Sequence, residues 1–389
     1  MITHVISLTD GTEIASGLNS DPVHLRQVEI QRTVNAGDDL TLGSVCAACM
    51  TATLITPGGN LSLNLAEESA IRVYAVDENG TRKNEGQFVL TKPTRSSQNT
   101  YKLTAYDNIS KLDTNLADWV NGLTGWPYSL FRFTQMVCTA CGLTLVNESL
   151  PNGASIQIQQ FTLEAVTGRQ LISYLAEACG MFVRSTLVGN VEFGWYALRS
   201  DAAIAPSQGA GIIPYLANSL SYEDYSVAPI RRVVIYRADG TKIEKVPSGF
   251  SGDASTLNTY QVMDNAVLSA MSDAAVQTVA ATIYDRLASF TYTPAKCKLW
   301  PNSGVATGDL IDVTDSNGVT IRTAIMSITI TGTETVESTG AASRQTAEAM
   351  NSDSYQQQVK QIMSDEKLKA ELIKEMVDYL DEDLICKFG

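Results

Sequence analysis

Histidine and cysteine come first, because their side chains can ligate metals, transfer protons or act as nucleophiles near neutral pH. The 389-residue chain has only two histidines, His4 and His24, and seven cysteines. We interpret His4 as an exposed residue near the start of a strand, and His24, beside Pro22, as a loop residue. Two histidines in the N-terminal part offer little basis for a Cys/His nucleophile pair or for a multi-histidine metal site. The sequence therefore predicts no histidine-based catalysis.

Two pairs of cysteines have the C-x-x-C spacing, Cys46/Cys49 and Cys138/Cys141. A structural zinc site would need both pairs to converge, and neither carries the glycine that usually opens a zinc knuckle. The first pair lies in an apolar, strand-like run, and the second lies near the end of a helix that Gly142 closes. We interpret both pairs as small core residues. An odd total of seven cysteines also favours free thiols over a disulfide framework.

Carboxylates are plentiful, but no pair of them stands out as a general acid and base. The acidic residues within 309–318 are spaced in a way that suggests a calcium loop, yet no glutamate completes the EF-hand pattern. We expect them to form a hairpin turn instead. The sequence also lacks a G-x-S-x-G elbow, an H-E-x-x-H helix, a Walker loop and a complete G-x-G-x-x-G. It thus identifies no catalytic residues, and we predict no enzyme, no cofactor and no metal.

Acidic residues outnumber basic ones by 42 to 28, which gives a formal net charge of −14 at pH 7. A surface that grips nucleic-acid phosphates needs a local excess of Lys and Arg, and a membrane-surface patch is likewise basic. The charge argues against both. No stretch approaches the roughly 20 apolar residues that cross a bilayer. Residues 1–8 lack the basic and apolar regions of a signal peptide, so we expect synthesis in the cytoplasm.

The length of the chain predicts more than one domain. Up to residue 106, short apolar runs are separated by turns, among them Asn79-Gly80, which is typical of a hairpin. At least five such strands favour a small barrel or a sandwich. Residues 107–201 then form an α+β region with two helices, the second capped by Thr167.

A stretch rich in Ala, Gly, Pro and Ser over 202–214 marks a boundary. The second β region that follows contains a hairpin around Asp239-Gly240 and a helix that Ser272 caps. The sequence therefore predicts a first β region, an α+β region, a second β region with one helix and a helical extension, over residues 1–106, 107–201, 202–345 and 346–389.

The predicted extension carries an amphipathic ridge. Its apolar members recur every four residues among Glu and Lys: Leu368, Leu372, Met376 and Leu380. Such a helix either docks on its own chain or bundles with copies of itself, and the heptad pattern is too short to choose between these. The four ridge residues are our candidates for partner binding.

Four segments are notable for their order along the chain: residues 40–44, which open a strand, then 101–113, 167–180 and 308–313. In this order and spacing they resemble the tail hub proteins of long-tailed bacteriophages and prophages of Firmicutes, also called baseplate hub or tail-associated proteins. The resemblance covers about residues 25 to 340.

The resemblance implies an α+β, mainly β fold with two tube-protein-like β-barrel domains, an α+β insert between them and a C-terminal helix. It implies a homotrimeric ring at the virion tail tip, which joins the tail tube to the tip and lines the DNA exit channel. The implied partners are a distal tail or tube protein and a tail spike, fibre or tape-measure protein. DNA would pass through the lumen without sequence-specific binding.

Some members of that family carry a C-terminal peptidase, lysozyme or fibre extension, whereas here only about 45 residues follow the second β region. We therefore expect a structural protein, with a tail-tip peptidoglycan hydrolase or a cell-wall or receptor-binding protein as the alternatives. Residues 351–389 hold nine acids and five bases, so −10 of the net charge belongs to the rest of the chain. An acidic lumen would repel DNA and let it slide.

Overall fold

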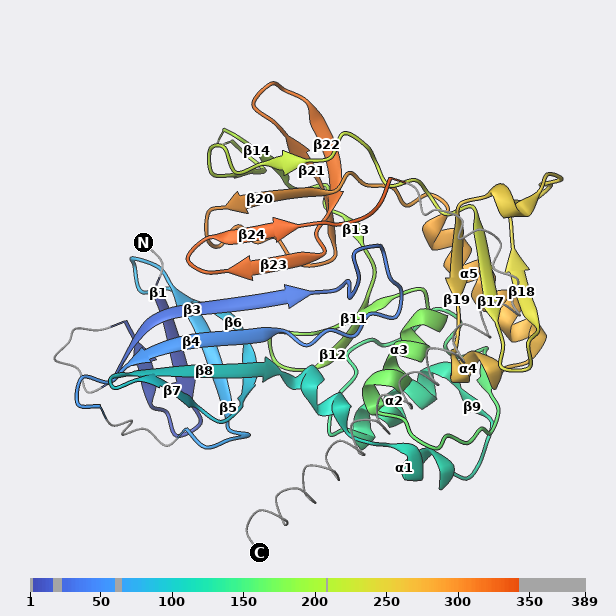
Figure 1. Cartoon of the computed structure of the whole chain (residues 1–389), viewed down its shortest axis with the longest axis horizontal. Helices are drawn as coiled ribbons and strands as arrows, with labels where there is room; N and C mark the ends of the chain where they lie inside the picture. The colour runs from blue at the N-terminus through green and yellow to red at the C-terminus, as the bar shows by residue number, and fades with distance from the viewer. Residues whose placement is uncertain (1–2, 17–22, 60–64, 208, 343–389) are drawn as a thin grey trace, which may run out of the picture. The chain divides into compact units, whose positions relative to one another are not determined.

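The computed structural model describes residues 3–16, 23–59, 65–207 and 209–342 (Figure 1). The predicted extension over 346–389 lies outside the described residues, as do the ridge residues Leu368, Leu372, Met376 and Leu380. In the described part, no helix is both long and apolar enough to cross a membrane.

Twelve strands pair into one large sheet, and all of their pairings are antiparallel. In chain order they are β1 (Thr3–Leu8), β2 (Glu13–Ala15), β3 (His24–Thr33), β4 (Cys49–Ile55), β5 (Ala70–Val76), β6 (Arg82–Leu90), β7 (Thr94–Ser97), β8 (Thr100–Asp107), β16 (Ser221–Tyr222), β20 (Ala295–Leu299), β23 (Ser327–Ile330) and β24 (Glu334–Glu337). The order across the sheet is β16-β20-β24-β23-β3-β4-β8-β6-β5-β1-β2, and β7 pairs with β8.

The pairing of β3 with β23 joins the first β region to the second one. Its register sets Ile30 opposite Ile330 and Thr33 opposite Ser327. The mainly β, α+β class is confirmed, but the described strands do not close into barrels. The strand β2 lies against β3, yet no backbone pairing links these two described strands. The two β regions therefore share one open sheet, which runs from the blue strands to the orange strands in Figure 1.

The α+β region packs short helices on small strand pairs. Its elements are η1 (Asn108–Asp113), α1 (Ala117–Asn121), β9 (Tyr128–Ser129), α2 (Leu130–Ala140), β10 (Gln157–Ile158), α3 (Gly168–Ala178), β11 (Phe182–Ser185) and β12 (Val191–Gly194). The predicted cap of the second helix is confirmed. The Thr167 hydroxyl accepts from the backbone of Gln170, and the Gln170 side chain accepts from the backbone of Thr167, which makes a capping box.

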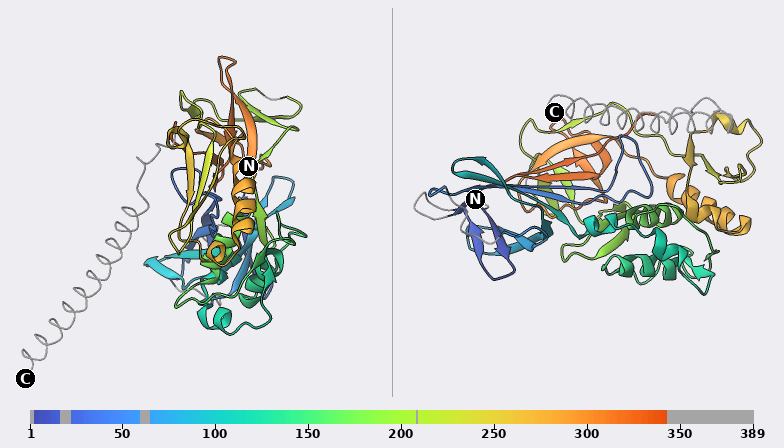
Figure 2. Two further views of the ribbon diagram at one scale, coloured as in Figure 1. Left: turned by 90° about the vertical axis from the view of Figure 1, so that its right-hand side faces the viewer. Right: turned by 60° about the horizontal axis from the view of Figure 1, so that its bottom comes forward.

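Two further sheets complete the described part. One contains β13 (Ala197–Leu198), β14 (Ala203–Ala205), β15 (Ile212–Pro214), β21 (Asp309–Thr314) and β22 (Thr320–Ala324). The other contains β17 (Arg232–Tyr236), β18 (Lys242–Lys245) and β19 (Thr259–Val262), with η2 (Ala254–Thr256), α4 (Ala266–Ser269) and α5 (Asp273–Leu287) beside it. The two views of Figure 2 show the orange helix α5 next to these yellow strands, and Ser272 caps it as predicted.

The hydrophobic core of the described residues falls into two clusters that both draw on distant segments. One cluster is formed mainly by side chains of the large sheet and includes Ile30, Met50, Leu103 and Ile328. The other joins the helices of the α+β region to α4, α5 and the sheet of β17, β18 and β19. The predicted second β region contributes to both clusters, so neither core is assembled from one continuous stretch of sequence.

Several local predictions were wrong. His4 lies inside β1 and His24 begins β3, and both side chains are buried, at 8% and 7% exposure. Residues 40–44 do not open a strand, because β4 begins only at Cys49. The apolar run from Cys46 to Cys49 is therefore mostly loop. The reason is tertiary, because the backbone groups of this segment bond to other parts of the molecule instead of to a neighbouring strand.

Candidate functional site

The connection between β3 and β4, residues 34–48, is the element on which the other regions meet, and we call it the junction loop. Its backbone bonds reach both the α+β region and the second β region. Val34 N donates to Met326 O at 2.9 Å, Leu42 N to Tyr260 Oη at 3.0 Å, and Gly43 N to Met181 O at 2.8 Å, while Val183 N donates to Ser44 O at 2.8 Å. Loops usually run over the surface because water can satisfy their backbone groups. This loop instead bonds to protein groups of the α+β region and of the second β region.

Gly43 is where the junction loop comes closest to α3. Its φ is +72°, a conformation that L side chains rarely adopt. A β-carbon at this position would lie 2.7 Å from Ser173 O and 2.9 Å from Glu177 Cβ. The Ser173 hydroxyl donates to Gly43 O at 2.7 Å, so a hydrogen bond also holds the junction loop against α3. Only glycine fits this backbone shape and this spacing together.

Asp107 and Arg169 hold the C-terminal end of the junction loop. The buried Asp107 carboxylate accepts from Ala48 N at 2.9 Å and from Ile109 N at 3.0 Å. Burial raises the pKa of Asp107 to about 6, although these two backbone bonds act in the opposite direction. Arg169 on α3 donates to Val45 O and forms a two-bond ion pair with Asp113 of η1, at 2.6 and 3.0 Å.

A network of charged side chains crosses the pairing of β3 with β23. Arg32 on β3 donates to the backbone oxygen of Glu85 and lies 3.3 Å from its carboxylate. Lys83 Nζ lies 3.4 Å from Glu85 and 3.9 Å from Glu334 on β24. The side chains of both glutamates are only 4% exposed. Charges taken out of water need such partners, so the network links the two β regions electrostatically as well as through the sheet.

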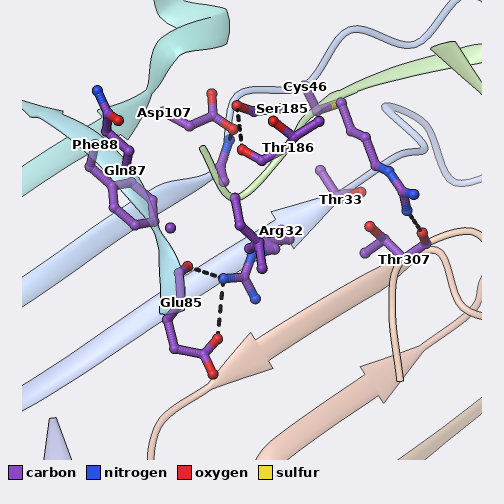
Figure 3. A pocket seen from close by; sticks show the side chains of 14 residues that line it. Arg32, Thr33, Cys46, Glu85, Gln87, Phe88, Asp107, Ser185, Thr186 and Thr307 are labelled. Atoms are coloured by element: carbon purple, nitrogen blue, oxygen red, sulfur yellow. Dashed lines mark hydrogen bonds and ion pairs between the residues drawn. The ribbon is translucent and has the colours of Figure 1, made fainter. Parts of the chain in front are cut away.

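Arg32, Glu85 and Asp107 line a small cavity, shown in Figure 3, that also touches the β11–β12 hairpin. Arg184 on β11 pairs with Glu192 at 2.7 Å and donates to the backbone oxygen of Thr307 in the second β region. The cavity holds about 30 Å³, which is room for one or two water molecules. The site is therefore a joint between three regions rather than a pocket for a substrate.

The residues that the sequence singled out do not converge on this joint. Cys46 lines the cavity, but burial raises the pKa of its thiol, which lowers its reactivity. Cys138 and Cys141 lie in the α+β core, where burial raises their pKa values to about 12 and about 11. Among the described residues, no three His, Cys, Asp or Glu side chains are grouped to hold a metal ion.

The acidic segment 309–318 forms the predicted hairpin turn. The Asp315 carboxylate accepts from the backbone of Asn317 and of Val319, both at 2.8 Å, which is turn chemistry. The residues of the joint that sequence reasoning missed are Gly43, Arg32, Lys83 and Glu85. The alternation of inward and outward side chains along β6 could have indicated that Glu85 is a buried charge. Nothing in the sequence, however, predicts that its partners lie at positions 32 and 83.

No family model and no curated protein matches this sequence. Among solved structures, the chain is similar to the 43 kDa tail protein of prophage MuSo2 from Shewanella oneidensis. The TM-score is 0.53 at 14% identity, over 87% of this chain and 97% of that one. A tail protein from Neisseria meningitidis MC58 matches with a TM-score of 0.50 at 13% identity, over 90% of this chain and 99% of that one. The chain has the fold of prophage tail proteins.

This tail-protein fold extends over both β regions and the α+β region, because each match covers most of both chains. The predicted fold is thus confirmed at the level of architecture. The restriction to phages of Firmicutes is not shown and stays a prediction.

Replacing Gly43 by alanine tests how closely the junction loop packs on α3. Gly80 provides the control, since its φ is +80° and a β-carbon there would meet nothing within 4 Å. Gly80→Ala should lower the free energy of unfolding by about 1–2 kcal/mol, the cost of a left-handed residue. Gly43→Ala should cost a further ~1–3 kcal/mol because α3 must move. Equal losses in urea denaturation would show that the contact is loose.

Replacing Arg32 by alanine tests the charged network. The variant leaves the Glu85 carboxylate buried with Lys83 alone, so we expect a loss of about 2–3 kcal/mol in unfolding free energy, below the 3–5 of a fully isolated buried charge. Arg82→Ala, which removes the exposed Arg82–Glu13 pair, should cost much less. The double variant Arg32→Ala/Glu85→Gln should recover part of the loss. A loss for Arg32→Ala no larger than that for Arg82→Ala would contradict the role given to the network.

Proposed function

We propose that this chain is a structural hub of a phage tail tip or baseplate, in which three copies form a ring that joins the tail tube to the tip. The observation that carries the proposal is the tail-protein fold, which spans 87% and 90% of the chain in the two matches. The solved proteins are tail proteins by description, and we extend that role to this chain. We place it at the tail tip of the virion.

The architecture of the described residues supports this role. The β3–β23 pairing fixes the two β regions in one register, and the junction loop fastens the α+β region to both. Three copies would present six β regions around one axis, which would match a hexameric tube by pseudo-sixfold symmetry. The cavity at the joint is of water size, so nothing at this site favours an enzyme, and we propose a non-enzymatic protein without cofactors.

The partners follow from this placement. A distal tail or tube protein would contact one face of the homotrimer, and DNA would pass through its lumen without sequence-specific binding. A spike, fibre or tape-measure protein would bind the ridge of Leu368, Leu372, Met376 and Leu380. The acidic balance of the chain would keep the lumen from gripping DNA.

The oligomeric state tests the ring. Light scattering on the purified chain should give three times the chain mass of 41.9 kDa, and electron microscopy should show threefold rings with acidic side chains on the lumen. A stable monomer at micromolar concentration would sink the ring, and a neutral or basic lumen would refute the sliding role. Incubation with peptidoglycan should release no fragments; release would favour the hydrolase alternative.

The ridge is tested by the double variant Leu372→Asp/Met376→Asp, which places charge on its apolar stripe. We expect the trimer mass to persist while co-purification with the co-expressed spike, fibre or tape-measure protein is lost. Lys374→Gln is the matched control, since residue 374 lies about 200° around a helix from residue 372, and it should keep the partner. Loss of the trimer in the double variant would instead mean that the ridge bundles with copies of itself.

A further inference from the structure

Asparagine followed by glycine is a pair of residues at which a chain can modify itself. A glycine has no β-carbon beside its backbone nitrogen, so this nitrogen can reach the side-chain carbonyl carbon of the preceding asparagine. The sequence contains four such pairs, which begin at Asn79, Asn121, Asn152 and Asn317. All four lie within the described residues, and their surroundings differ.

Two of the four asparagine side chains are held in place by hydrogen bonds. The exposed Asn121 side chain donates to Leu163 O at 2.9 Å and accepts from Leu163 N at 3.0 Å. The Asn152 side chain donates to Thr282 Oγ1 at 2.6 Å. The glycine that follows it is also crowded, since a β-carbon at Gly153 would lie 2.9 Å from the nearest side chain. Neither amide can turn toward the backbone without breaking these bonds.

The other two pairs lie at the tips of hairpins. Asn79 and Asn317 are exposed, and a β-carbon on the glycine that follows either of them would meet nothing within 4 Å. Asn317 Nδ2 donates to Asp315 Oδ2 at 3.4 Å, a long bond that constrains the amide little. The turn holds the N–H of Gly318, but its bond to Asp315 O is long as well, at 3.2 Å. These two amides can therefore rotate toward the nitrogen of the next residue.

Asp315 gives a reaction at Asn317 a structural consequence. The Asp315 carboxylate accepts from Asn317 N and Val319 N, and its Oδ2 also accepts from Tyr222 Oη at 3.1 Å. Tyr222 belongs to β16, which ends the large sheet on this side in the described part of the chain. One carboxylate thus connects the β21–β22 hairpin to the edge of another sheet.

We propose that Asn317 is a site of spontaneous deamidation and that its product releases the β21–β22 hairpin from β16. Gly318 N loses its proton to a base and bonds to Asn317 Cγ, after which the Cγ–Nδ2 bond breaks and ammonia leaves with a proton returned by that base. Water then opens the succinimide ring, which yields aspartate or isoaspartate at position 317. The co-reactant is water, and nothing is oxidised or reduced. The reaction does not depend on whether the chain forms a ring.

The product changes the contact with Asp315 in two ways. The amide that donated to Asp315 Oδ2 over 3.4 Å becomes a carboxylate, so two negative groups face each other in place of a hydrogen bond. Isoaspartate also lengthens the backbone of a turn whose bonds to Asp315 depend on its length. Asp315 must then turn away, and the bond from Tyr222 Oη is lost.

Peptide mapping by mass spectrometry on the whole chain, incubated in mildly alkaline buffer, tests the site. Peptides that contain Asn79 or Asn317 should gain the mass of an amide-to-acid conversion. The peptide with Asn121 should convert about thirtyfold more slowly than that with Asn317, because two hydrogen bonds must break first. Conversion of Asn317 at the same rate as Asn121 would overturn the proposal.

Hydrogen exchange in the peptide covering β16 tests the release. It should be about fivefold faster in the converted chain, as expected for one lost hydrogen bond, and Asn317→Asp should show a similar rise without incubation. Asn79→Asp is the matched control at the other hairpin and should leave β16 unchanged. Tyr222→Phe already lacks the bond, so conversion should add nothing in it. Exchange that is the same before and after conversion of Asn317, or that rises further in converted Tyr222→Phe, would overturn the release.

Discussion

The backbone of the junction loop is the constraint on which the described structure depends. A loop that lies between other elements cannot leave its N–H and C=O groups to water, so each group must find a partner in the protein. Here the partners come from β19, from Met181 and Val183 at the start of β11, and from Met326 just before β23. The loop therefore fixes where these three segments lie relative to β3, and a change in its conformation would break bonds to all three at once.

The shared sheet gives this arrangement its stiffness. Backbone ladders resist sliding, because a slip of one residue would turn the apolar face of a strand to water. The pairing of β3 with β23 places Ile30 and Ile328 in one core. At the same boundary, ion pairs connect the two β regions through Arg32, Glu85, Lys83 and Glu334. This seam between the two β regions therefore holds them in one register.

Local signals in the sequence predicted local structure well. The caps at Thr167 and Ser272, the Asn79-Gly80 and Asp239-Gly240 turns and the helix stop at Gly142 all depend on residues close in sequence, and the structure confirms them. The seam could not be predicted, because it pairs residues about 300 positions apart and strand alternation does not encode a partner. The burial of His4 and His24 was missed for the same reason, since it follows from which segments cover their strands.

The structure shows how some of the charges counted in the sequence are used. Arg32, Arg169 and Arg184 point into the joint, where each pairs with a carboxylate or a backbone oxygen. Acids such as Asp38, Asp39 and Glu223 instead line an open groove of about 550 Å³ beside β16. Basic side chains used as internal connections cannot contribute to a surface that grips DNA. Each of these arginines also pairs with an acid, so the pairs leave the net charge of −14 unchanged. The acidic balance of the chain therefore comes from carboxylates without an arginine partner, such as those that line this groove.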